Sequence, residues 1–173
     1  SYVVNPFTKD AYFDFDLFRK HVGLAQRIMD DIIDLEIEKI ERIMDKIKSD
    51  PESNEVKGSE MMLWEKIYKK SGQGRRTGVG ITAEGDMIAA MGLRYGTQEA
   101  TDFSVEVHKT IAVEAYRSSV NMAKERGAFA VYDSEREKDN PFVNRIKEAD
   151  PALYEEMKQY GRRNIACLTI APT

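Results

Sequence analysis

Residues 162–173 read Arg162-Arg163-Asn164-Ile165-Ala166-Cys167-Leu168-Thr169-Ile170-Ala171-Pro172-Thr173. Two arginines and an asparagine precede an almost unbroken apolar run, which is typical of a short strand buried on both faces of a parallel sheet. Pro172 cannot donate a hydrogen bond to a neighbouring strand, so the strand is expected to end before it. In α/β proteins, ligands bind just beyond the carboxyl ends of such strands. The sequence therefore predicts that a ligand loop begins here.

A second short strand is predicted over residues 77–81, after a loop at residues 71–74. Gly78 and Gly80 follow two arginines and resemble a nucleotide-binding loop at first sight. The Lys-Ser/Thr of a phosphate-binding P-loop is absent, and Gly85 falls too late for the dinucleotide-binding glycine spacing. We therefore interpret these glycines as positions where neighbouring elements approach closely.

Most of the remaining chain has helical periodicity. After an extended arm over residues 1–12, Asp14 or Asp16 is expected to cap a helix to about Ser49, either unbroken or bent near residues 34–35. Asp50-Pro51 is expected to end this helix and to start the next, which runs through Tyr68.

The second half of the chain continues the helical pattern. Thr82 is expected to cap a brief helix closed by Gly92, and Thr97 a longer interior helix ended by Gly127. A charged loop is expected over residues 128–139. Asn140-Pro141 and Asp150-Pro151 each combine a cap with a first-turn proline, which predicts two further short helices.

Composition excludes several classes of protein. The chain has 173 residues and a net charge of −4, without a basic stripe, so direct nucleic-acid binding is not expected. No apolar run approaches the roughly 18 residues of a membrane span, and no signal peptide is visible. The single cysteine excludes an internal disulfide, and these features together predict a cytoplasmic location.

The predicted elements do not make a complete sheet. Two buried parallel strands need neighbouring strands and cover on both faces. The sequence is therefore predicted to be a mostly helical segment, with about two short buried strands, of a larger α/β structure.

Several motifs resemble the large catalytic chain of ribonucleotide reductases. Arg163-Asn164 with the strand and Ala-Pro-Thr resembles the family's phosphate-loop strand, and residues 74–86 are similar to its Arg-Arg-x-Gly-x-Gly strand. The adenosylcobalamin-dependent (class II) branch is the most similar in the segments Asn5-Pro6-Phe7, Phe13-Asp14-Phe15-Asp16, Ala115-Tyr116-Arg117-Ser118-Ser119, Glu135-Arg136-Glu137-Lys138-Asp139-Asn140-Pro141-Phe142 and Tyr160-Gly161-Arg162-Arg163-Asn164.

The resemblance implies a fold and a reaction. Residues 1–173 would form part of a catalytic barrel of ten strands flanked by helices. The parent enzyme would convert ribonucleotides to deoxyribonucleotides with adenosylcobalamin, whose homolysis generates a cysteine thiyl radical that abstracts the substrate's 3′ hydrogen. The remainder of the reductase chain and the ribonucleotide substrate are the implied partners, and self-association is a further expectation.

The resemblance also implies where this chain would act. Ala171, Pro172 and Thr173 match the start of the substrate phosphate loop, which continues in the family with glycine and hydroxyl residues. No position matches the radical cysteine or the reducing cysteine pair, so the isolated segment is expected to be inactive. The chain would begin just after the radical-cysteine loop and end inside the phosphate loop, as expected of a truncated chain or of a gene interrupted by an intervening sequence.

Other candidate residues have structural interpretations. Cys167 lies mid-strand and is predicted to be a buried apolar residue rather than a catalytic thiol. Arg162 and Arg163 are predicted to pair with carboxylates at the strand entry. No metal site is expected: the helical Glu-x-x-His pattern is absent around Glu106, His108 and Glu114, and a solvated face is predicted for Asp30, Asp31, Asp34 and Glu36.

An alternative function remains open on the sequence. A free-standing helical interaction protein without catalytic activity would explain the long Glu/Lys/Ile-rich helix and the missing catalytic residues. A glycine and hydroxyl-rich loop encoded after Thr173 would favour the reductase segment instead.

Overall fold

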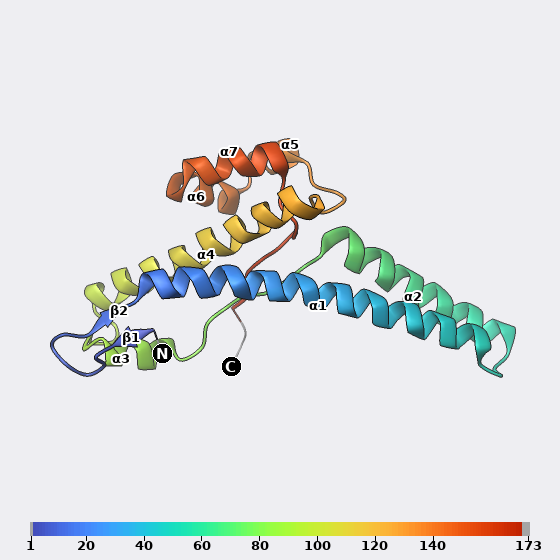
Figure 1. The fold of residues 1–173 in the computed structure, drawn as a ribbon, viewed down its shortest axis with the longest axis horizontal. Helices are drawn as coiled ribbons and strands as arrows, with labels where there is room; N and C mark the ends of the chain where they lie inside the picture. The colour runs from blue at the N-terminus through green and yellow to red at the C-terminus, as the bar shows by residue number, and fades with distance from the viewer. Residues whose placement is uncertain (1, 171–173) are drawn as a thin grey trace.

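The long helix α1, Phe15–Ser49, runs along the longest dimension of the molecule (Figure 1). The structure is a computed structural model that describes residues 2–170. Asp14 caps it as predicted, because its side chain accepts a hydrogen bond from the Leu17 N–H. The helix is one continuous element across residues 34–35, in agreement with the alternative of a single long helix.

Helix α2, Asn54–Gly74, returns alongside the C-terminal half of α1, and the two form an arm that extends from the body (Figure 1). The predicted start at Asp50-Pro51 is wrong: Asp50 closes α1 through its backbone N–H, and Ser53 caps α2. The predicted stop at residues 71–74 is also wrong, because the helix continues to Gly74 and Arg75 closes it in a left-handed conformation.

Helix α4, Gln98–Arg126, is the centre of the body. Thr97 caps it and Gly127 ends it, as predicted. It packs against α1 on one side and against α6, Pro141–Ala149, and α7, Pro151–Tyr160, on the other (Figure 1). This position explains its two apolar faces, because both are covered by helices.

Three local predictions need correction. Residues 2–13 form a small antiparallel hairpin of β1, Val3–Val4, and β2, Tyr12–Phe13, rather than a simple extended arm. Helix α3, Glu84–Ala90, begins after Ala83, which has a left-handed backbone and offers no side-chain cap, so the predicted Thr82 cap is wrong. The charged loop at residues 128–139 contains one helical turn, α5, Ser134–Glu137. The Asn140 and Asp150 caps of α6 and α7 are confirmed.

The two predicted strands are extended segments that lie side by side. Val79 and Leu168 form a parallel bridge, and the Val79 N–H donates to the Cys167 carbonyl at 2.8 Å. The Thr169 N–H in turn donates to the Val79 carbonyl at 3.1 Å. Parallel pairing is therefore confirmed, although the pairing is limited to a short ladder.

The described chain is mostly helical. Its main hydrophobic core lies between the hairpin, α1, α4, α6 and α7, and the paired segments cross it at Cys167. Between residues 2 and 170, no helix has the length and apolar character needed to cross a membrane.

Candidate functional site

The two paired segments approach unusually closely at the glycines. A Cβ atom built on Gly80 would lie 2.5 Å from the Thr169 carbonyl oxygen, and one on Gly78 would lie 3.0 Å from the Thr169 Cβ. Only a residue without a side chain fits at such a distance without movement of the backbone. The interpretation of these glycines as close-approach positions is therefore confirmed.

A buried carboxylate joins α1 to the start of both segments. Asp30 is fully buried and accepts hydrogen bonds from Arg75 Nε at 2.8 Å and from Arg163 Nε at 3.3 Å. Arg126 lies 3.7 Å from the same carboxylate. The predicted solvated face is thus wrong for Asp30, whose charge is balanced by arginines from three other parts of the chain.

Burial and hydrogen bonding act on Asp30 in opposite directions. Burial alone would raise the pKa of its carboxyl, but hydrogen bonds from Arg75 and Asn164 outweigh burial, and the pKa is lowered. Asp30 is therefore an anion at neutral pH.

Arg162 holds the charged loop against the second segment. Its guanidinium is buried, pairs with Glu137, and donates to the carbonyls of Asn164 and Ile165 at 3.1 Å each. Three aromatic rings surround it at 5.3 to 5.7 Å, those of Tyr116, Phe129 and Tyr132. The prediction that Arg162 and Arg163 pair with carboxylates is confirmed, with Glu137 and Asp30 as the partners.

Cys167 is a structural residue in this arrangement. Its side chain is fully buried in the main core, as predicted. Burial raises the pKa of its thiol to about 12, so almost no reactive thiolate forms at neutral pH.

This environment predicts slow labelling of Cys167. In the folded chain at pH 8, a thiol reagent should modify Cys167 far more slowly than in denaturant, where the thiol is exposed and its pKa is ordinary. Since the folded pKa is raised, this group should also make the protein less stable as pH rises above about 9. Stopped-flow labelling with and without denaturant measures the first effect, and equal rates would show that the thiol is not buried.

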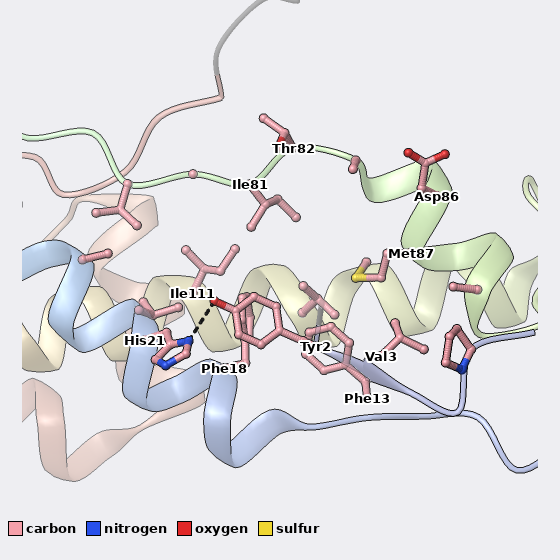
Figure 2. A pocket seen from close by; sticks show the side chains of 18 of the residues that line it. Tyr2, Val3, Phe13, Phe18, His21, Ile81, Thr82, Asp86, Met87 and Ile111 are labelled. Atoms are coloured by element: carbon pink, nitrogen blue, oxygen red, sulfur yellow. Dashed lines mark hydrogen bonds between the residues drawn. The ribbon is translucent and has the colours of Figure 1, made fainter.

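A pocket of about 580 Å³ lies beside the paired segments. Figure 2 shows the aromatic side chains of Tyr2, Phe13 and Phe18 facing Ile81 and Met87 across it. The pocket has few polar groups. The Tyr2 hydroxyl lies 3.2 Å from His21 Nδ1, and Thr82 and Asp86 lie on the opposite side, with Ile81 and Met87 (Figure 2). The lining is suited to apolar side chains rather than to a charged substrate.

The possible metal ligands are engaged by protein groups. His108 Nε2 lies 3.3 Å from Glu84, which also accepts from the Ser104 hydroxyl. The carboxylates of Asp30, Asp31 and Asp34 lie within 4.8 Å of one another, but arginines pair with each of them. This acidic cluster is therefore explained by ion pairs.

Some of these residues were not identified from the sequence. Gln26, Thr77 and Ser119 form buried hydrogen bonds around Asn164. Gln26 and Asp30 continue the i, i+4 spacing of the buried Phe18 and Val22. Two polar residues in line with a buried apolar stripe were the feature of the sequence that could have predicted their burial. The predicted phosphate-loop residues Ala171, Pro172 and Thr173 lie outside the described residues.

Comparison with known proteins identifies the class of protein to which this arrangement belongs. The profile of the family described as "Ribonucleotide reductase, barrel domain" matches residues 1–173. The chain therefore belongs to the ribonucleotide reductase barrel-domain family, and its helices and paired segments are part of that barrel.

Individual relatives are distant. The ribonucleoside-diphosphate reductase subunit alpha of Chlamydia pneumoniae is 25% identical over 92% of this chain and 15% of its own length. The vitamin B12-dependent ribonucleoside-diphosphate reductase of Thermoplasma acidophilum is 29% identical over 73% of this chain and 13% of its own length. The large chain of the Neurospora crassa reductase is 27% identical over 57% of this chain. The chain thus spans only a small part of the curated relatives it matches.

Proposed function

We propose that this chain is a segment of a ribonucleotide reductase that converts ribonucleotides to deoxyribonucleotides in the cytoplasm. The segment contributes part of the barrel wall and, through Ala171, Pro172 and Thr173, the start of the substrate phosphate loop. The observation that carries this proposal is the match of the barrel-domain family to the whole chain. The parallel pairing of Val79 with Leu168 supports the barrel-wall part of the proposal, because parallel neighbours are expected in a sheet flanked by helices.

The chain has a role in binding rather than in radical chemistry. Its single cysteine, Cys167, is fully buried in the core, where it cannot contact a substrate, so the radical and reducing thiols are assigned to the remainder of the parent chain. Hydroxyl and backbone N–H groups after a strand can bind a phosphate, which is the role proposed for the Ala-Pro-Thr turn.

Adenosylcobalamin is the cofactor proposed for the parent enzyme, on the strength of the B12-dependent relatives and of the class II motifs. The described residues do not fit a cobalamin site. His21 interacts with Tyr2 and His108 with Glu84, while the pocket beside Ile81 is lined by core side chains. We therefore assign cobalamin binding to the remainder of the parent chain.

The remainder of the reductase chain is the proposed partner of the open side of this segment. The backbone groups of Gly78 and Gly80 have no hydrogen-bond partner within residues 2–170, although Val79 between them is fully paired. They form an unpaired strand edge next to the apolar pocket. A neighbouring barrel strand would pair with this edge and would fill the pocket with its apolar side chains.

The test of this function compares two proteins in one assay. The full-length reductase that contains this segment should form deoxyribonucleotide when adenosylcobalamin and a dithiol are supplied, without a second radical-generating subunit. The 173-residue chain should form none above a no-protein control, since it lacks the catalytic cysteines. A full-length enzyme that needs another radical source would contradict the cobalamin assignment. Product from the isolated chain would contradict the assignment of the catalytic residues to the remainder of the protein.

A further inference from the structure

Asn164 is a buried hydrogen-bonding centre at the start of the second segment. Its side-chain oxygen accepts from Gln26 Nε2 at 2.9 Å and from the Ser119 hydroxyl at 2.8 Å. Its side-chain nitrogen donates to Asp30 at 2.8 Å and to the Arg75 carbonyl at 3.0 Å. The amide group thus uses its full hydrogen-bonding capacity, and the residue has no exposed surface.

These contacts join four parts of the chain. Gln26 and Asp30 belong to α1, Ser119 belongs to α4, and Arg75 begins the first segment. The backbone N–H of Asn164 also donates to the Ser119 hydroxyl at 3.0 Å. Gln26 extends the network to Thr77, whose hydroxyl donates to the Ala166 carbonyl at 3.0 Å. The network therefore fixes both extended segments to the two long helices.

The chemistry of this network favours specificity over stability. A buried polar network contributes little more to stability than apolar packing of the same volume, but it permits only one arrangement of its partners. Here the arrangement that is selected is the pairing register of the two segments. A slip by one residue would turn every side chain to the opposite face.

Register matters at this place because of Gly78 and Gly80. Both lie against Thr169, and the space there admits no additional side-chain atoms on the first segment. A slip would also remove Cys167 from the core, where it is fully buried. Ile170 directly precedes the residues proposed to bind phosphate, so a shift of the second segment would shift them with it.

We propose that Asn164 is a positioning residue for the substrate phosphate. Through its bonds to Gln26, Asp30 and Ser119, it sets the register of residues 164–170 and so the place where Ala171–Thr173 meet the substrate. This inference rests on the proposed function. It adds a residue that does not touch substrate but determines how well substrate binds.

The experiment uses the full-length reductase with Asn164→Ala and a matched core variant, Val107→Ala, which removes fully buried apolar atoms of a residue that makes none of the network's side-chain hydrogen bonds. Asn164→Ala should raise KM for the ribonucleotide about tenfold while kcat changes less than about twofold, since displaced binding groups weaken binding. Val107→Ala should leave KM unchanged. Where Asn164→Ala does not fold, Ser119→Ala removes two hydrogen bonds of the network and leaves the others, so it should raise KM by a smaller factor.

Three results would overturn the inference, and Thr173→Val separates the first two. If Thr173→Val raises KM but the Asn164 and Ser119 variants do not, the phosphate proposal stands and the positioning role of Asn164 fails. If Thr173→Val also leaves KM unchanged, the phosphate proposal itself fails, and the positioning role fails with it. Equal rises in KM for Val107→Ala and Asn164→Ala would show that general loss of stability, rather than register, is responsible.

Discussion

Replacement of Asp30 by alanine should lower the free energy of unfolding by about 3–5 kcal/mol, because it leaves buried cations without their partner. Arg75 is almost as buried as Asp30, with a side chain that is 5% exposed. Its Nε donates a hydrogen bond to the Asp30 carboxylate, and its Nη2 donates one to the Asp30 backbone carbonyl. Arg163 and the Asn164 amide would also lose an acceptor. Denaturant unfolding monitored by circular dichroism measures the change.

Asp34→Ala is the matched control for this prediction. Asp34 pairs with the same Arg75 at 2.8 Å, but its side chain is 48% exposed. An exposed ion pair contributes about 1 kcal/mol or less, so this variant should lose little stability. Similar losses for Asp30→Ala and Asp34→Ala would contradict the central position of Asp30.

The Asp30 carboxylate also predicts a pH dependence. Because its pKa is lowered in the folded chain, its contribution is complete above the ordinary carboxyl pKa of 3.8 and is lost as pH falls through the folded value. Wild-type stability should therefore fall in acid more steeply than the stability of Asp30→Asn.

Replacement of Gly80 by alanine should destabilise the chain by about 1–3 kcal/mol, because the new Cβ atom would overlap a backbone oxygen. The overlap is with the Thr169 carbonyl, at 2.5 Å, and a backbone atom cannot move aside as a flexible side chain can. The two segments should separate, and amide exchange at Val79 and Thr169 should accelerate, since both N–H groups take part in their pairing.

Gly58→Ala is the control for Gly80→Ala. Gly58 lies in α2, and no described heavy atom outside its own helical backbone and chain neighbours would lie within 4 Å of an added Cβ. Alanine there should stabilise the helix by roughly 0.5–1 kcal/mol. Loss of stability at both glycines would mean that the close approach of the segments is not the cause.

Local signals in the sequence predicted most helix ends correctly. Asp14, Thr97, Asn140 and Asp150 each accept a hydrogen bond from the first turn of a helix, an interaction that depends only on nearby residues. The failures at Thr82 and at Asp50-Pro51 have local causes too. Ala83 adopts a left-handed backbone without a side-chain cap, and Asp50 is used to end α1.

The buried network could not be predicted in the same way. Asp30, Asp31 and Asp34 occur close together on one helix, but of these three only Asp30 contacts both Arg75 and Arg163 and is fully buried. Arg163 lies far from Asp30 in the sequence, and no periodicity of α1 reveals such a partner. The parallel pairing of the segments was predictable because each has an apolar pattern of its own.

The most direct test of the barrel-segment proposal is to measure the isolated chain with and without the remainder of the reductase chain. Sedimentation, binding of a dye specific for apolar surface, and thermal melting report self-association, exposure of the pocket, and packing. Because the backbone groups of Gly78 and Gly80 have no hydrogen-bond partner within residues 2–170 and an apolar pocket lies beside them, the chain alone should self-associate or bind dye and melt broadly. Addition of the remainder, in trans or in one polypeptide, should abolish dye binding and sharpen the melt. A monodisperse monomer that melts cooperatively, binds no dye and is unaffected by the remainder would contradict the proposal and would favour a free-standing helical protein.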